Sequence, residues 1–449
     1  MQNTRRDFVK KVALGTAGVT MGGLGLSAKS YGSIIGSNDR INVGIIGFSD
    51  RTRNSLVDAM LSQAKDFNFA FTAVSDIWNR RRDEAKAFLA QRDVSVDLYR
   101  NNEELYEKSN VDAVIIGTAD FQHALHTIEA VEAGKDAYVE KPFAETMEDN
   151  RKGRAAVERT GKIVTIGSQR RSGANYHAAH EFIKSGRFGD IVMVEMTWNV
   201  NQPGRWRRPG LVAQIRERDT DWKRYIMNRP YEPWDPRKYL EYRLFWPYSS
   251  GIPGQWMAHQ IDTVHWFSGY DYPRSVAANG GVYLWKDGRE NADTMTAVFD
   301  YGPKDDPSKG FQVVYSSRFT NSAGGVKELY YSNGGTLNLA TNRITSEGGL
   351  AENHARAMNM EPNLLPEKEL PSAAIVTAAD TGVDSMTLSH MRNWMECVRS
   401  RKEPNAPVKS GYDHSVANIM VTAALRTGQF VTFDEEQQEV MAGGVVFHY

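Results

Sequence analysis

The sequence predicts two domains: an α/β N-terminal domain built on a doubly wound parallel sheet, and an α+β C-terminal domain with a large, mostly antiparallel open sheet. Three observations lead to this prediction. The 449 residues exceed what one ordinary core holds, since a domain averages about 150 residues. From Arg40 onwards, short apolar strands alternate with helical segments. From Ile191 onwards, strand-like runs follow one another without the helices that a second parallel sheet would need.

The expected strands of the N-terminal domain are short buried runs bounded by turn residues. A helix follows the first strand as far as Lys65, and another covers His123–Ala133. Because βα units of this length repeat, the strands run parallel with helices on both faces, which is the Rossmann arrangement. We place this Rossmann domain at residues 39–168. Its expected strands are Ile41–Ile46, Phe69–Ser75, Val111–Gly117, Ala137–Glu140 and Ile163–Gly167.

The remaining chain, residues 169–449, forms the predicted C-terminal domain, whose final helices are able to pack back on the Rossmann domain. A segment rich in Trp, Arg and Pro, Asn201–Tyr248, is interpreted as an insertion that covers a pocket. A solvated charged face is the alternative, because acidic residues alternate with its arginines. The expected strands are Ile191–Val200, Ser275–Trp285, Thr294–Asp300, Gly310–Arg318 and Thr336–Leu339.

Composition excludes several classes of protein. A formal net charge of −1 argues against a nucleic-acid binder, since phosphate affinity needs a basic excess. The single cysteine, Cys397, excludes an internal disulfide and a thiolate zinc cluster. Eight of the ten tryptophans lie between Trp198 and Trp285, among Arg, Asp, Asn and Gly. Flat apolar rings beside hydrogen-bonding groups suit a sugar, which has C–H faces and a polar rim.

The first 38 residues are typical of an export signal and linker. Paired Arg5 and Arg6 precede an apolar, Gly-rich stretch over Val12–Leu26, which is the pattern of a twin-arginine signal. The stretch is too short and too broken for a spanning helix, so no stable membrane anchor is expected. The twin-arginine export machinery is therefore a predicted partner, and the predicted location is periplasmic. Because this route is associated with folded proteins, any nucleotide cofactor is expected to be tightly held.

The turn after the first strand is the candidate nucleotide site. A dinucleotide fingerprint reads G-x-G-x-x-G, but here only Gly47 remains, with Ser49 and Thr52 in the other two glycine positions. The second strand ends at Asp76, where a carboxylate can accept both ribose hydroxyls and repel a 2′-phosphate, which favours NAD. The alternative for Asp76 is a helix N-cap. Arginines 80, 81 and 82 follow it, so NADP is also possible.

Three motifs and the chain's end resemble the Gfo/Idh/MocA oxidoreductases, which include glucose–fructose oxidoreductase and inositol 2-dehydrogenase. Thr118–Ala124 resembles the family's T-P-x-x-x-H turn, and Glu140-Lys141-Pro142 is similar to its E-K-P. Gly254–Asp262 resembles its D-x-x-x-H-x-x-D helix, and His390–Leu425 its closing helices. The resemblance implies an NAD(P)-dependent oxidoreductase that acts on a secondary alcohol of a sugar, glycoside or polyol. It also implies a homo-oligomer, a dimer or tetramer, with the large sheet often supplying the contact.

The resemblance also assigns residues. It implies Lys141 and His259 as catalytic residues, with a surface lysine and a structural histidine as the alternatives. It implies substrate contact for Gln255 and Asp262, although a structural role for Asp262 is also open. Arg170 and Tyr176 follow the last strand of the Rossmann sheet, close to the crevice where such sheets bind ligands, and are further candidates for substrate contact. No metal is expected, because no complete ligand pattern occurs. The cofactor candidates are Gly47, Phe48, Ser49, Arg51, Asp76, Thr118, His123, Glu140 and Lys141.

One departure leaves the reaction open. The family's aspartate four residues before the histidine is Gln255 here, which hydrogen-bonds a hydroxyl but cannot take a proton. The alternative is therefore an NAD-dependent glycoside hydrolase that works by transient oxidation, elimination and re-reduction. A third hypothesis is a non-catalytic sugar-binding protein, against which the presence of Lys141 and His259 counts.

Overall fold

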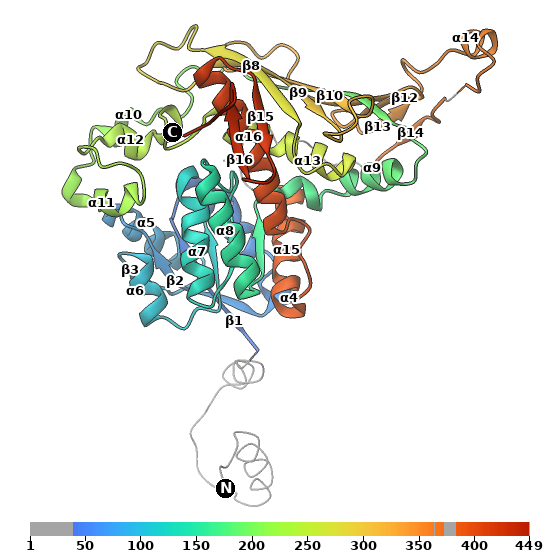
Figure 1. Ribbon diagram of the computed structural model, residues 1–449. Coiled ribbons are helices and arrows are strands. Elements are labelled where there is room, and N and C mark those ends of the chain that lie inside the picture. Colours follow the sequence, from blue (N-terminus) through green and yellow to red (C-terminus); the bar gives the residue numbers. More distant parts are fainter. Residues whose placement is uncertain (1–38, 363, 372–382, 449) are drawn as a thin grey trace, which may run out of the picture. The chain divides into compact units, whose positions relative to one another are not determined.

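The computed structural model describes residues 39–448, except 363 and 372–382. The predicted export signal, residues 1–38, lies outside the described residues. Ile41–Tyr449 forms one compact unit with two sheets, the first lower and the second upper in Figure 1. None of the helices in the described part of the chain combines the length and the apolar character that a membrane span requires.

The first sheet has six parallel strands in the order β3-β2-β1-β4-β5-β6, which confirms the doubly wound arrangement. The order reverses between β1 and β4, where open α/β sheets bind ligands. The strands are β1 (Ile41–Ile46), β2 (Phe69–Ser75), β3 (Asp97–Tyr99), β4 (Ala113–Ile116), β5 (Asp136–Val139) and β6 (Val164–Ile166). The helices between them are α3 (Val57–Leu61), α4 (Ala64–Phe67), α5 (Asn79–Ala90), α6 (Asn102–Lys108), α7 (His123–Glu132) and α8 (Met147–Thr160).

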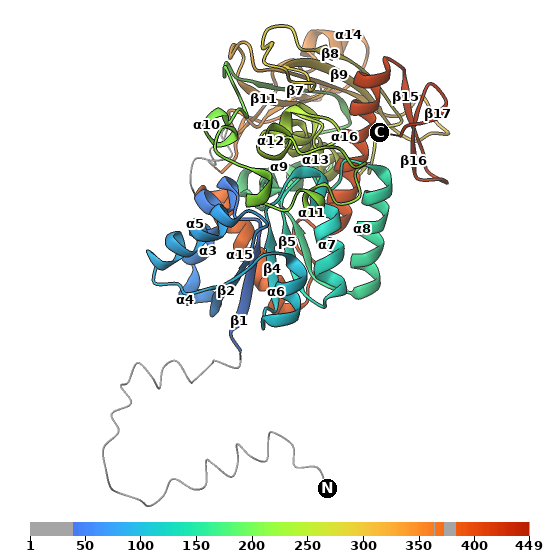
Figure 2. The same ribbon diagram turned by 90° about the vertical axis from the view of Figure 1, so that its left-hand side faces the viewer.

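Two apolar cores cover the faces of this sheet (Figure 2). On one face, α3 and α5 pack against β1 and β2 together with α15 (Ser385–Ser400), a helix from near the end of the chain. On the other face lie α6, α7 and α8. Trp394 of α15 is fully buried and packs at a ring-centroid distance of 5.8 Å from Tyr138 of β5. The Rossmann core is thus completed by residues that follow β7 to β14 of the second sheet in the sequence.

The second sheet has eleven strands in the order β14-β13-β12-β11-β7-β10-β9-β8-β15-β16-β17. Every named pair in it is antiparallel except β7 with β10, so the predicted large, mostly antiparallel sheet is confirmed. The central strands are β7 (Ile191–Asn199), β8 (Ser275–Gly281), β9 (Thr294–Tyr301), β10 (Phe311–Arg318), β11 (Val326–Ser332), β12 (Gly335–Asn338) and β13 (Arg343–Thr345). The edge strands are β14 (Lys368–Glu369), β15 (Val431–Asp434), β16 (Glu439–Ala442) and β17 (Val445–Val446).

One face of the second sheet is covered by helices and the other is open. The inward residues of β7, β9 and β10 join a core with α9 (Ala174–Lys184), α13 (Ala258–Ser268) and α16 (Val408–Thr427). On the opposite face Val298 of β9 is exposed. The remaining short helices are α10 (Pro209–Val212), α11 (Trp222–Ile226), α12 (Pro236–Leu240) and α14 (Glu352–Ala357).

Several elements differ from the sequence-based expectation. The helix expected up to Lys65 is interrupted at Ser62 and Gln63, between α3 and α4. No strand was expected for β3, β11 or β13–β17. Short strands at a sheet edge, such as β3 and β14, carry too few buried residues to give an alternating pattern. In β11 the buried face includes Glu328, which conceals the alternation of an otherwise regular strand.

Candidate active site

Two adjoining cavities lie at the carboxyl ends of the Rossmann strands. The first, of about 100 Å³, is lined by Lys141, His259 and residues of both sheets. The second, of about 170 Å³, follows the turns after β1 and β2 and includes Asp76. The two cavities share the lining residues Ser49, Arg51, Gly117, Thr118 and Arg243, so they form one continuous site.

The turn after β1 is tight and closed by hydroxyl groups. Gly47 has φ +80°, and a Cβ there would lie 2.7 Å from Thr118 Cγ2, so only glycine fits. Thr52 Oγ1 donates to the carbonyl of Gly47 at 3.0 Å and lies 3.1 Å from Ser49 Oγ. Ser49 and Thr52 therefore hold this turn with side-chain hydrogen bonds, although they replace two glycines of the fingerprint.

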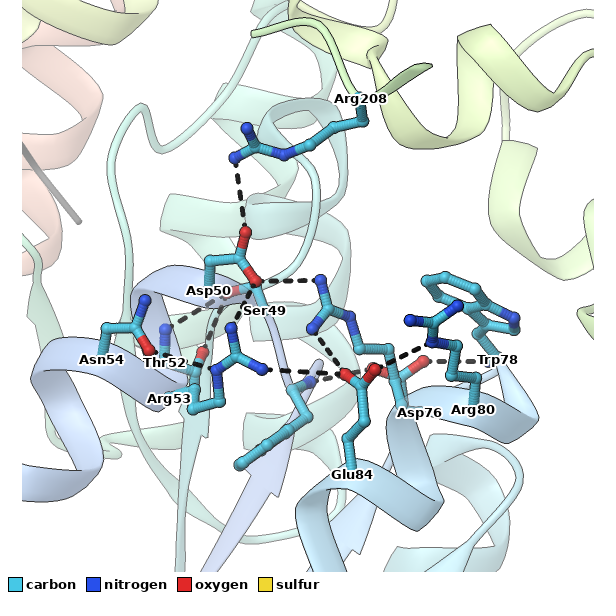
Figure 3. Close-up of polar contacts among 12 residues, drawn as sticks. Ser49, Asp50, Thr52, Arg53, Asn54, Asp76, Trp78, Arg80, Glu84 and Arg208 are labelled. Atoms are coloured by element: carbon cyan, nitrogen blue, oxygen red, sulfur yellow. Dashed lines mark hydrogen bonds and ion pairs between the residues drawn. The ribbon is translucent and has the colours of Figure 1, made fainter. Parts of the chain in front are cut away.

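Asp50 lies in the same turn and is surrounded by arginines (Figure 3). Its carboxylate is 2.9 Å from Arg81 Nη2, and 3.3 Å from both Arg53 Nη2 and Arg208 Nη2. Burial raises the pKa of Asp50, but Arg81, Arg208 and Arg53 outweigh it and hold the pKa below its usual value. Arg208 belongs to the insertion Asn201–Tyr248, so this ion-pair group joins the insertion to the first sheet.

Asp76 occupies the end of β2, as the sequence predicts, and lines the second cavity. Its two carboxylate oxygens accept from the backbone N–H groups of Phe48 and Trp78, each at 2.9 Å. The alternative of a helix N-cap is not what the structure shows, because the N-cap of α5 is Trp78. Asp76 instead accepts from the backbone on both sides of it, and each oxygen retains a second lone pair for a ligand. Burial raises the pKa of Asp76. Phe48 itself is fully buried, and its backbone N–H positions Asp76.

The ends of β4 and β5 bring the family-like motifs together. His123 Nδ1 lies 2.8 Å from the carbonyl oxygen of Pro142, which connects the two turns. Glu140 pairs with Arg51 at 3.0 Å, and this arginine holds the pKa of Glu140 below its usual value against the effect of burial. Thr118 lines both cavities, and its buried Oγ1 has no hydrogen-bond partner.

Lys141 is buried at the centre of the first cavity. Its Nζ donates to the main-chain carbonyls of Gln255 at 2.5 Å and Gly254 at 3.3 Å. Burial lowers the pKa of Lys141 to about 8, although Asp120 and Glu140 oppose the shift. A lysine with this pKa exchanges its proton near neutral pH, unlike a solvated surface lysine.

His259 lines the same cavity from α13 of the C-terminal domain. Its ring stacks on Trp198 at a centroid distance of 5.9 Å, and Trp198 stacks on Trp256 at 5.7 Å. Burial, followed by the charges of Lys141 and Arg170, lowers the pKa of His259 well below its usual value. The imidazole is therefore neutral at physiological pH and able to accept a proton.

Gln255 lies between two charged residues that the sequence analysis did not identify. Its Nε2 donates to Asp120 Oδ2 at 2.5 Å, and its Oε1 accepts from Arg243 Nε at 2.7 Å. Asp120 also accepts from Ser249 Oγ at 2.6 Å. Asp120 stands within the motif Thr118–Ala124 and was identifiable there. Arg243 had no comparable signal, since it is one of many arginines in the insertion.

Of the three remaining candidates for substrate contact, two line the cavity and one does not. Arg170 and Tyr176 line the cavity and both contact the buried carboxylate of Glu328. Asp262 does not lie on the cavity wall as expected. It is fully buried and pairs with Arg171 at 2.8 Å, because its position on α13 faces the turn after β6. We therefore correct its assignment from substrate contact to holding these two elements together.

The insertion Asn201–Tyr248 forms much of the outer wall of the site. Arg205 lines the first cavity, whereas Arg216 and Arg218 are exposed to solvent. The second cavity is lined from this segment by Arg208, Leu211, Arg224, Tyr225, Tyr239, Leu240, Tyr242 and Arg243. The interpretation of the insertion as a pocket cover is confirmed, and the solvated-face alternative holds only for part of it.

Comparison with known proteins finds a family model that matches the first domain alone. Residues 41–168 match the family model GFO_IDH_MocA, described as an oxidoreductase family with an NAD-binding Rossmann fold. The chain is 32% identical over 135 residues to 1,5-anhydro-D-fructose reductase of Ensifer adhaerens, covering 28% of this chain and 40% of that protein. It is 32% identical over 123 residues to inositol 2-dehydrogenase of Klebsiella pneumoniae, covering 27% and 36%. The chain thus matches less than half the length of these curated relatives.

Solved structures share the fold over most of the chain. The WlbA dehydrogenase of Bordetella pertussis, solved with NADH and UDP-GlcNAcA, superposes with a TM-score of 0.62 at 18% identity, covering 88% of this chain and 98% of that one. A levoglucosan dehydrogenase, solved with NADH and levoglucosan, superposes with a TM-score of 0.61 at 13% identity, covering 88% and 99%. Both sheets, and not only the Rossmann domain, therefore have counterparts in known dehydrogenases.

Proposed function

We propose that this chain, whose residues 41–168 belong to the Gfo/Idh/MocA oxidoreductase family, is an NAD(P)-dependent oxidoreductase acting on a secondary alcohol of a sugar or polyol. One observation carries the proposal. Lys141 from the Rossmann domain and His259 from the C-terminal domain line one cavity, which is continuous with the cavity at Asp76. Two proton-accepting groups beside a nucleotide groove are what oxidation of an alcohol requires.

The residues of the second cavity fit a dinucleotide. Gly47 allows close approach of the backbone, and the unpaired Oγ1 of Thr118 needs a hydrogen-bond partner. Asp76 is placed for ribose hydroxyls. When bound, a nicotinamide would accept hydride from the carbinol carbon.

We infer NAD rather than NADP from the contacts of the neighbouring arginines. Arg81 pairs with Asp50 at 2.9 Å and with Glu84 at 2.8 Å. Arg80 pairs with Glu84, and Arg82 donates to the carbonyl of Asp76 at 2.6 Å. Because of these three arginines, the sequence alone left NADP possible as the cofactor. In the structure all three contact groups of the protein, and the charge of Asp76 disfavours a 2′-phosphate.

The chain's own residues provide the proton transfer. The neutral amine of Lys141 is the proposed base for the substrate hydroxyl, because its pKa of about 8 allows it to lose its own proton near neutral pH. The neutral imidazole of His259 is the second group able to accept that proton. Asp120 and Gln255 position the surrounding donors, with Gln255 between Asp120 and Arg243.

We further propose that the protein retains its cofactor, as suits the predicted twin-arginine export to the periplasm. The insertion Asn201–Tyr248 supports this, since it supplies one wall of the nucleotide cavity and its Arg208 pairs with Asp50. A homo-oligomer remains the prediction for assembly, and the open face of the large sheet, with exposed Val298, is its candidate contact. Light scattering of the purified protein measures the assembly directly.

The test of the proposed function begins with the purified protein. Denaturation and mass spectrometry identify any released nucleotide, and the NAD-loaded protein is then mixed with a panel of sugars and polyols. Lasting near-ultraviolet absorbance of reduced nicotinamide is the expected result. Release of a sugar product without lasting reduction would indicate the glycoside hydrolase instead. A protein that binds neither nucleotide contradicts both.

A further inference from the structure

The substrate end of the first cavity carries more positive than negative groups. Its lining there includes Lys141, Arg170, Arg205 and Arg243. Against these four stand the carboxylate of Asp120 in the lining and that of Glu328, which pairs with Arg170 from behind the cavity wall. The other acidic residues of the lining are engaged elsewhere, Glu140 with Arg51 and Asp384 with the first backbone N–H groups of α15.

Arg170 has an unfilled hydrogen-bonding position. Its Nη1 pairs with Glu328, which lies behind the cavity wall, but its buried Nη2 has no hydrogen-bond partner. Only 6% of Arg170 is exposed, so bulk water does not solvate this nitrogen freely. A buried donor on a charged group without a partner is costly, and a ligand acceptor in the cavity would remove that cost.

The residue between Asp120 and Arg243 adds no charge. The family motif that Gly254–Asp262 resembles has an aspartate where this chain has Gln255, whose amide contacts both neighbours. An aspartate here would add a negative charge beside Arg243 and repel an anionic ligand. The same charges act on His259, whose pKa is lowered first by burial and then by Lys141 and Arg170.

An apolar wall stands beside these cationic groups. Trp198 and Trp256 lie nearly parallel, with an interplanar angle of 9°, and both line the cavity. The guanidinium of Arg205 lies 5.7 Å from the ring of Trp256. A flat wall with guanidinium groups beside it suits a sugar ring with an anionic substituent, because Arg recognises carboxylate and phosphate by paired hydrogen bonds.

We propose that the substrate is a sugar or polyol that carries an anionic group, a carboxylate or a phosphate, bound by Arg170, Arg205 and Arg243. This inference rests on the proposed function, since it places the alcohol to be oxidised at Lys141 and His259. The arginines then determine which sugars enter the site, and neutral sugars bind more weakly.

The experiment compares matched ligands on the NAD-loaded protein. Uronates, aldonates and sugar phosphates are each paired with their neutral counterparts, and dissociation constants are measured by calorimetry. At least one acid is expected to bind about ten- to a hundredfold more tightly than its neutral partner, with a preference that falls as salt rises. Comparison of the uronates and aldonates with the sugar phosphates shows whether the bound anion is a carboxylate or a phosphate. Equal affinity within every pair, or no binding of any acid, overturns the inference.

Variants locate the anion. Arg205→Met and Arg243→Met keep the apolar stems and should each reduce the preference for the acid at least severalfold. Affinity for NAD should be unchanged in Arg205→Met, because Arg205 lines the first cavity alone, whereas Arg243 lines both cavities. Arg218→Met, an exposed arginine of the same insertion, is the matched control. An equal loss of affinity for NAD in the two variants would assign the arginines to the cofactor and contradict the inference. If neutral sugars reduce the bound NAD and no acid binds more tightly than its neutral partner, the proposed function stands while the anionic substrate does not.

Discussion

The ammonium of Lys141 donates to the main-chain carbonyl of Gln255 at 2.5 Å, across the boundary between the two domains. Lys141 follows β5 of the Rossmann sheet, whereas Gln255 lies in the turn Pro253–Met257 that leads into α13. This contact fixes the position of the nitrogen in the cavity that His259 also lines. The position of the proposed base is thus determined by the backbone of the other domain.

The rate of substrate oxidation should rise with pH through about 8. Lys141 accepts a proton only when neutral, and its pKa is lowered to about 8, so the active fraction grows as pH increases. His259 has a pKa well below this range and contributes no second step there. Single-turnover reduction of bound NAD, measured against pH, should show this step in the wild type and lose it in Lys141→Ala. A Lys141→Ala variant with an unchanged profile would remove the lysine from the proton path.

His259→Ala should retain the fold and bound NAD while losing about 10²–10⁴-fold in rate, the usual range for a lost general base. The side chain belongs to α13 and stacks on Trp198, away from the nucleotide cavity. Rapid-mixing measurement of NAD reduction checks the rate, and calorimetry checks the cofactor. Reduction near the wild-type rate would restrict His259 to a packing role on Trp198.

Asp76→Ala should weaken NAD binding by about 2–4 kcal/mol, because two charge-assisted hydrogen bonds to the ribose are lost. The affinity for NADP should rise relative to that for NAD, because the charge that disfavours a 2′-phosphate is removed. Asp76 also accepts two backbone hydrogen bonds, so thermal unfolding is measured alongside affinity. Asp83→Ala is the control, because Asp83 is an exposed carboxylate on α5. If NAD affinity is unchanged and only the melting temperature falls, Asp76 serves as a backbone cap alone.

Asp262→Asn should lower stability rather than affinity for substrate. Breaking a buried ion pair costs about 3–5 kcal/mol, and the pair with Arg171 is almost fully buried. The pKa of Asp262 is held at about 2 in the fold, so its contribution is present above the unfolded value of 3.8 and is lost as pH falls through about 2. Urea unfolding at several pH values measures this. A stable variant with a raised KM would return Asp262 to the substrate site.

Replacing both arginines of the predicted signal, Arg5→Lys with Arg6→Lys, should trap the precursor inside the cell, because twin-arginine recognition depends on the pair. Fractionation and immunoblotting of the periplasm measure the outcome. Lys10→Arg in the same segment serves as a charge-matched control. Undiminished periplasmic yield of the double variant would contradict the export route.

Local patterns in the sequence predicted the parts of the site that a single strand or turn determines. Asp76, Lys141 and His259 each stand within a motif at the end of a strand or on a helix, where spacing fixes their place. Arg208 could not be predicted in this way, since it meets Asp50 across 158 positions of sequence. The same holds for Arg170, whose contact with Glu328 depends on the register of β11 in the large sheet.

Both large folding units were predictable because βα repeats and consecutive strands leave clear patterns of apolar residues. The direction in which the Asp262 side chain points was not predictable. The i, i+3 spacing places Asp262 near His259 on the helix, but it does not say which segment packs against that face of the helix. Arg171, one position after Arg170, takes that carboxylate. Arg170 and Arg171 thus have different roles although they are neighbours in the sequence. The difference arises from the way α13 packs against the turn after β6.

The place of α15 bears on how the protein is made. Met391, Trp394, Met395 and Val398 complete the apolar core beneath β1 and β2, yet they are among the last residues that the ribosome adds. Domains generally fold as they emerge, the N-terminal one first. Until α15 has been made, α3 and α5 cover only part of this face of the nucleotide-binding sheet, and the rest of its apolar surface stays exposed. The nascent chain therefore exposes that part of the face while β7 to β14 of the second sheet are synthesised, and chaperone capture during translation should concentrate there.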